Sequence, residues 1–162
     1  MPSRSPLSID EVVALLSGMP GWLEALSAGL PAVRTHPRMA DSWSANDILA
    51  HLRSCSDVWG EAIARILAED EPVIRAINPR SWIRRTNYGE LQFAQSLEAY
   101  CRQREDLLVV LRALATDDWR RAATITGAGA PLTRTVHTYA EKLAVHERTH
   151  RAQLQRAMTV GE

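Results

Sequence analysis

Several features that mark specialised classes of protein are missing from this sequence of 162 residues. Its 19 basic and 19 acidic residues cancel, so no net charge draws the chain to nucleic acid or to an anionic membrane. No apolar run approaches the roughly 20 residues that span a bilayer, and the first residues lack the apolar core of a signal peptide. We therefore expect a cytoplasmic protein that binds neither nucleic acid nor membranes.

Cysteine is also scarce. Cys55 and Cys101 form no CxxC pair, and both fall within helical patterns. This usage is typical of small buried side chains in a reducing compartment. A disulfide between two helices is the alternative.

The sequence also lacks the sustained period-two alternation that marks half-buried strands. Apolar residues instead recur at helical spacing in four stretches, residues 8–30, 44–68, 87–115 and 132–158. Four amphipathic helices without a strand predict an all-α fold. We expect an antiparallel four-helix bundle with two longer connections, folded as a single domain over residues 1–162.

Capping residues predict where the helices begin. In a capping box, a Ser or similar side chain and an acidic side chain three residues later bind each other's backbone N–H groups. The first three helices begin with such a pair: Ser8 with Glu11, Ser44 with Asp47, and Asn87 with Glu90. Within the first helix, Pro20 lacks the N–H that a helix interior needs and predicts a kink or a break.

Three of the five histidines fall on the apolar faces of the predicted helices. His146 and His150 are four residues apart and so share one helix face, and His51 lies within the apolar face of the second helix. A histidine in such a place is usually a hydrogen-bonded core residue. Burying three imidazoles together is nevertheless costly unless each nitrogen has a partner, which a metal ion supplies. We therefore predict a divalent-metal site made of these three residues, with a fourth position open as in catalytic sites. His36 and His137 are predicted not to be ligands.

Residues 146–150 also spell H-E-x-x-H, the zinc-protease motif in which the glutamate is the general base. Such a protease takes a third ligand from downstream, but the 12 residues after His150 contain neither His nor Asp. We therefore interpret Glu147 as a residue on the flank of the apolar face, either solvated or paired with Arg151. A role for Glu147 in acid–base catalysis is the alternative.

The start of the second helix, W-S-A-N-D-I-L-A-H-L over residues 43–52, and the pattern His146-x-x-x-His150-x-x-Gln153-Leu154 resemble the DinB-like (YfiT-type) superfamily. The resemblance covers essentially the whole chain in the order and length of its helices. It implies a four-helix bundle, often dimeric, in which three histidines hold zinc, nickel or a similar divalent ion. Carried over to this sequence, the ligands are His51, His146 and His150. The position of Glu147 is not restricted to glutamate in that family.

The resemblance also bears on function. Members of the superfamily include S-transferases and isomerases that depend on low-molecular-weight thiols such as bacillithiol or mycothiol. It therefore implies a thiol-dependent S-transferase, a homodimer, that acts on a small electrophilic substrate through a thiol or water ionised by the metal. Two alternatives stay open: a metal-dependent hydrolase that uses Glu147, and a non-enzymatic stress-related or interaction bundle with a structural metal or none.

A basic run between the second and third helices has two interpretations. Arg80, Arg84 and Arg85, with Trp82 among them, either cap the metal site and bind the carboxylates of a thiol, or form a solvated loop.

Overall fold

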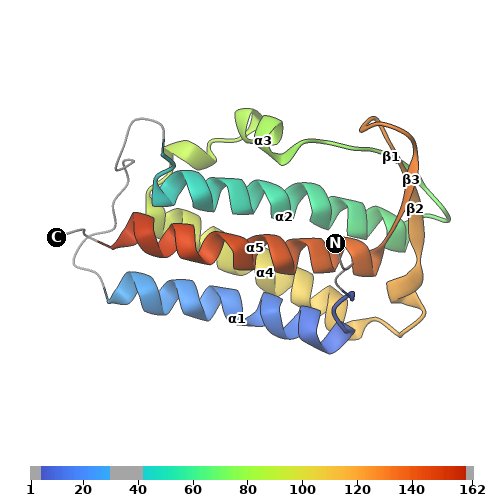
Figure 1. Cartoon of the computed structure of the whole chain (residues 1–162), viewed down its shortest axis with the longest axis horizontal. Helices are drawn as coiled ribbons and strands as arrows, with labels where there is room; N and C mark the ends of the chain where they lie inside the picture. The colour runs from blue at the N-terminus through green and yellow to red at the C-terminus, as the bar shows by residue number, and fades with distance from the viewer. Residues whose placement is uncertain (1–4, 30–41, 160–162) are drawn as a thin grey trace.

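The structure is a computed structural model that describes residues 5–29 and 42–159. Four long helices form a bundle in this part of the chain (Figure 1): α1 (Ile9–Ala28), α2 (Ala45–Ala68), α4 (Phe93–Ala113) and α5 (Val136–Met158). The shorter helical pieces are α3 (Pro79–Trp82) and three 3-10 turns, η1 (Ile83–Arg85), η2 (Tyr88–Glu90) and η3 (Asp118–Arg120). The predicted four-helix bundle is confirmed. Within the described ranges, no helix combines the length and apolar character needed to cross a bilayer.

Two of the three predicted capping boxes begin helices. The Ser8 hydroxyl accepts the N–H of Glu11 at 3.2 Å, and the Ser8 N–H donates to the Glu11 carboxylate at 2.7 Å. Ser44 and Asp47 make the same reciprocal pair at the start of α2. These local contacts satisfy N–H groups that have no partner within the helix, which is why the sequence alone located both starts.

The prediction at Pro20 was a kink or a break; helix α1 runs through Pro20, so the break is wrong. A proline inside a helix costs about 3 kcal/mol, because it removes one hydrogen bond and crowds the preceding turn. The turns on both sides of Pro20 are held in the core by Leu16, Met19 and Leu23, all of which are buried. Burial of three such side chains outweighs that cost.

The third long helix begins later than predicted. Asn87 makes no side-chain cap, and only its backbone oxygen accepts the Glu90 N–H, in the turn η2. α4 itself starts at Phe93. The residues before it are held to α2 instead, since the Asn46 side chain donates to the backbone oxygen of Leu91 at 3.1 Å.

Three short strands close one end of the bundle, where the sequence predicted none. They are β1 (Val73–Arg75), β2 (Ala122–Thr126) and β3 (Leu132–Thr135), with β2 in the middle, parallel to β1 and antiparallel to β3. Segments of three to five residues are too short for an alternating pattern to be recognised. Residues 132–135, predicted as helix, are therefore strand, and α5 begins only after Thr135, whose side chain caps it. Gly127 and Gly129 join β2 to β3 with positive φ angles of 83° and 94°.

The order of the helices places α2 against α5. α1 and α2 occupy opposite corners of the bundle, and each packs against both α4 and α5. After α2, the chain returns along the bundle through α3 to the end at which α2 started, so α4 runs parallel to α2 (Figure 1). α5 runs antiparallel to α2 and brings its second half beside the first half of α2.

A polar layer crosses the interior of the bundle where the second half of α5 lies beside the first half of α2. Two clusters of buried apolar side chains fill the bundle, one toward the sheet and the other toward the opposite end. On α4 they are separated by Arg104, and on α5 by the segment that contains His146 and Glu147. The predicted site residues therefore lie where the apolar core is interrupted.

Candidate metal centre

The three histidines predicted as ligands meet between α2 and α5. The Nε2 atom of His51 lies 2.9 Å from Nε2 of His146, which in turn lies 3.2 Å from Nε2 of His150. His51 is buried, and the other two rings are half-buried. The antiparallel packing of α2 on α5 thus brings together three side chains whose ring nitrogens face one another.

Aromatic side chains hold the three rings in place. Trp43, just before α2, stacks on His150 with an interplanar angle of 7° and meets His51 edge-on. Trp59 meets His146 edge-on, with 5.3 Å between the ring centroids. Fixed orientation of this kind is what a preorganised ligand set requires.

The environment keeps these imidazoles neutral. Burial, followed by the neighbouring histidines, lowers the pKa of His51 to about 4. The pKa of His146 is also lowered to about 4, and that of His150 is lowered chiefly by burial. A neutral imidazole has one nitrogen free to accept a proton or a metal. Nδ1 of His150 lies 2.5 Å from the side-chain oxygen of Gln153, an acceptor that fixes the ring proton on Nδ1 and leaves Nε2 as the ligand atom.

The donor set fits a divalent metal ion. In a tetrahedral site with metal–nitrogen bonds of about 2.0 Å, ligand nitrogens lie about 3.3 Å apart, close to the two separations between the Nε2 atoms. Without an ion, N–H groups of the neighbouring rings can pair only some of these three nitrogens. A cation satisfies all three lone pairs at once. Imidazole ligands suit zinc, copper, iron and nickel alike.

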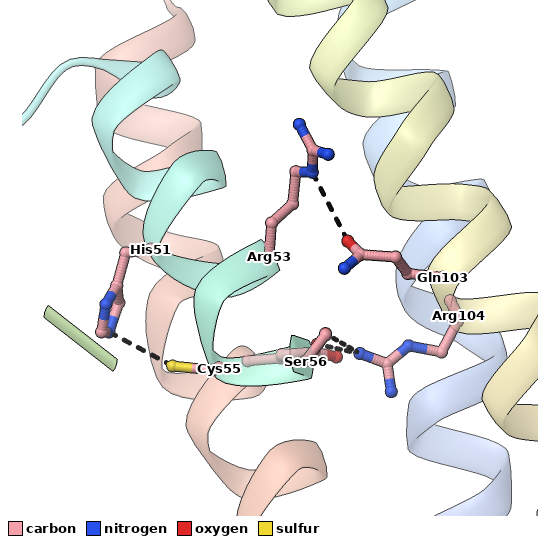
Figure 2. Close-up of polar contacts among 7 residues, drawn as sticks. His51, Arg53, Cys55, Ser56, Gln103 and Arg104 are labelled. Atoms are coloured by element: carbon pink, nitrogen blue, oxygen red, sulfur yellow. Dashed lines mark hydrogen bonds and ion pairs between the residues drawn. The ribbon is translucent and has the colours of Figure 1, made fainter. Parts of the chain in front are cut away.

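Cys55 is a residue at this site that the sequence interpretation missed. It follows His51 by one turn on α2, and Figure 2 shows both side chains on the same side of the helix, away from Arg53 and Ser56. Its Sγ atom is 3.7 Å from Nε2 of His51, and the candidate ligand atoms of His51, Cys55 and His146 all lie within 4.8 Å of one another. The signal was present in the sequence, because His51 and Cys55 have the same spacing as the two histidines of α5.

Two ligand sets therefore share His51 and His146, and they differ in whether His150 or Cys55 is third. Nε2 of His150 lies 3.2 Å from Nε2 of His146, and Sγ of Cys55 lies 3.7 Å from Nε2 of His51. The three-histidine set rests on the two contacts of His146, whereas in the set with Cys55 all three ligand atoms lie within 4.8 Å of one another. Cys55 and Cys101 are both free thiols, so the alternative of a disulfide is wrong.

A Cys55→Ala variant is expected to keep its metal. If the three histidines are the ligands, both wild type and variant hold one equivalent of Co(II), and neither spectrum contains a thiolate-to-cobalt charge-transfer band. Metal analysis and near-ultraviolet absorption of the cobalt-loaded proteins test this. A band in the wild type that disappears in the variant would place Cys55 among the ligands.

Glu147 is turned into the core. Its side chain is 2% exposed and forms an ion pair with Arg104 of α4, which is 1% exposed. The prediction that it is solvated or paired with Arg151 is wrong; Arg151 lies over the ring of Trp22 instead. The flank of α5 that carries Glu147 is interior because α1 covers it, which the sequence of α5 alone does not reveal. The carboxylate of the H-E-x-x-H pattern is thus already engaged by a guanidinium.

Of the remaining residues named in the sequence analysis, some lie at the histidine cluster and others lie elsewhere. His137 donates its Nε2–H to the backbone oxygen of Leu7, 2.8 Å away, far along α5 from the cluster. His36 lies outside the described residues. Of the basic run, Arg80 reaches the site, with its guanidinium carbon 5.1 Å from the centre of the Trp43 ring.

The other members of the run behave differently. Arg84 is exposed, and Arg85 lies over the ring of Trp82. The Trp82 indole N–H donates to Asp57 on α2 at 3.0 Å, so this tryptophan anchors the connection rather than capping the histidines.

A four-helix bundle with three converging histidines on two of its helices defines a class of protein. The comparisons with known proteins place the chain in a superfamily with this fold. The profile of the DinB superfamily matches residues 21–154, and the chain belongs to this superfamily. The predicted resemblance is confirmed.

A solved structure, that of YfiT from Bacillus subtilis, has the same fold. It is described as a probable metal-dependent hydrolase with an unusual four-helix bundle topology. The superposition covers 96% of this chain and 92% of that one with a TM-score of 0.70, at 16% sequence identity. Likeness at this level of identity shows the fold alone. No curated protein matches the chain.

Proposed function

We propose that the chain is a divalent-metal-dependent enzyme whose ligands are His51, His146 and His150. The observation that carries this proposal is the convergence of three neutral imidazole nitrogens between α2 and α5. Three protein ligands leave a fourth position for a substrate or for water, which distinguishes catalytic from structural sites.

We further propose that the enzyme transfers a low-molecular-weight thiol to a small electrophile. A bound divalent metal ion lowers the pKa of a thiol or water at its open position. A thiol ionised in this way needs no general base from the protein, and Glu147 is engaged by Arg104. Arg80 lies against Trp43 at the rim of the site, where its guanidinium can pair with a carboxylate of the thiol.

A hydrolase is the second candidate. It is favoured by the description of YfiT as a probable metal-dependent hydrolase. The same three histidines would then hold a metal whose open position takes water. A non-enzymatic bundle with a structural metal is the remaining alternative.

Binding of N-acetylcysteine to the cobalt-loaded Cys55→Ala variant tests the thiol proposal. This variant has no thiol of its own beside the site, so a charge-transfer band that grows during the titration comes from the added thiol. We expect an Arg80→Gln variant to bind N-acetylcysteine about tenfold more weakly, because a charge-assisted hydrogen bond to its carboxylate is lost. Arg84→Gln, an exposed neighbour in the same run, is the matched control and is expected to bind as before.

Turnover then separates the three candidates. Conjugation of N-acetylcysteine to chlorodinitrobenzene that disappears on chelation supports the transferase. Hydrolysis of nitrophenyl acetate without any thiol supports the hydrolase. A metal that raises the melting temperature while neither substrate reacts supports the structural bundle.

A further inference from the structure

A large cavity lies beside the candidate metal centre. It has a volume of about 940 Å³ and opens between α2, α5, the sheet and the connection that follows β1. This volume is within the range of pockets that enclose organic ligands of moderate size. None of the three histidines lines it.

One side chain separates the cavity from the histidines. Trp59 follows Cys55 by one turn on α2, and Lys142 precedes His146 by one turn on α5. The Trp59 ring contacts His146 on one side, and the Lys142 ammonium lies 4.5 Å from its centre. The wall of the cavity at Lys142 is therefore about one helical turn, or roughly 5 Å along the helix axis, from the candidate metal centre.

The walls of the cavity are apolar. Trp59 and Tyr139 contribute aromatic surface, and Ile74 and Ile125 contribute aliphatic surface from the sheet. Burying a flat or aliphatic molecule against these side chains is favourable at roughly 25 cal/mol for each Å² removed from water.

The rim of the cavity is cationic. Arg75, Arg134 and Lys142 line it, and among the residues that the structure describes none of these three forms an ion pair with a carboxylate. Two acidic residues of the lining, Asp57 and Glu61, stand against these three cations, so the charge of the three cations is not fully balanced, and the Asp57 carboxylate is turned toward Trp82, Tyr88 and Gln103.

Two of these cations lie close enough to affect each other. Arg134 lowers the pKa of Lys142, after the larger effect of burial. An anion between them would relieve that repulsion. The combination of apolar walls and neighbouring cations selects for one class of molecule, an organic acid with an apolar body.

We infer that the cavity binds a small organic carboxylate, with its apolar body against Trp59 and its anionic group toward Lys142 and Arg134. If the carboxylate is the substrate, the inference rests on the proposed function, because it places the substrate one turn from the metal. Binding of the carboxylate can also be tested in the metal-free protein. The cavity site and the proposed enzyme function can therefore fail separately.

Naphthalene-2-carboxylate and its neutral counterpart naphthalene-2-carboxamide are suitable probes. Calorimetric titration of the full chain, metal-free and zinc-loaded, is expected to show the carboxylate binding at least about tenfold more tightly than the amide in both forms. A Lys142→Met/Arg134→Gln double variant is expected to bind the two probes equally while its affinity for the amide stays the same. Both side chains are exposed, so the variant should fold normally. Arg120→Gln, at an exposed arginine outside the lining, is the control.

Several results would overturn the inference. They are equal affinity of the wild type for the two probes, no binding of either, and unchanged discrimination in the double variant. Binding of the carboxylate only to the zinc-loaded protein would also overturn it, because the metal and not the cationic rim would then hold the anion. Binding of the carboxylate by a protein that takes up no metal would leave the cavity site intact and remove the proposed enzyme.

Discussion

A His51→Ala variant is expected to lose its metal, from about one equivalent per chain in the wild type to almost none. In the proposed three-histidine site, His51 is the one ligand from α2, and without it the two histidines of α5 would hold the ion with two nitrogens instead of three. Metal analysis of untagged protein after purification measures the loss. His150→Ala is expected to give the same result.

His137→Gln is the matched control for this experiment. His137 lies on the same helix as two of the ligands, but its ring is bound to the backbone oxygen of Leu7. Its replacement should leave the metal content unchanged. Retention of metal in His51→Ala together with its loss in His150→Ala would contradict the three-histidine site. A residue other than His51 would then be the third ligand beside the two histidines of the H-E-x-x-H pattern.

The histidine cluster was predictable because its parts follow local rules. Spacing of four residues places His146 and His150 on one face of any helix, and a capping box fixes the start of α2 and hence the phase of His51 on it. The antiparallel contact between α2 and α5 does not follow from these local rules. The structure supplies it through the return of the chain along the bundle after α2.

The residues that were misplaced depend on contacts between distant segments. The sequence of α5 by itself places Glu147 on a polar flank. Its partner Arg104 comes from a helix whose apolar pattern gives no reason to bury a guanidinium. The late start of α4 likewise results from a bond between Asn46 and Leu91, across 45 residues of sequence. Propensity and periodicity describe neither kind of contact.

The second large effect is expected at that buried ion pair. Glu147→Ala leaves the guanidinium of Arg104 buried without its carboxylate, and loss of one partner of a buried pair costs about 3–5 kcal/mol in the free energy of unfolding. For a chain of this length, that corresponds to a decrease of roughly 10 °C in the melting temperature. Glu98→Ala, which removes the exposed partner of Arg102 on the same helix as Arg104, should have no measurable effect.

A double variant distinguishes a structural Glu147 from a catalytic one. Arg104→Met with Glu147→Leu replaces both charges by apolar side chains, and such replacements of buried pairs are often neutral or stabilising. We expect thermal unfolding to show recovery of most of the stability lost in Glu147→Ala, with one equivalent of metal retained. If Glu147 only joins α5 to α4, the double variant also keeps its metal-dependent turnover. A stable, metal-loaded and inactive double variant would instead make Glu147 the general base of the H-E-x-x-H pattern, since stability and catalysis would then have been separated at this carboxylate.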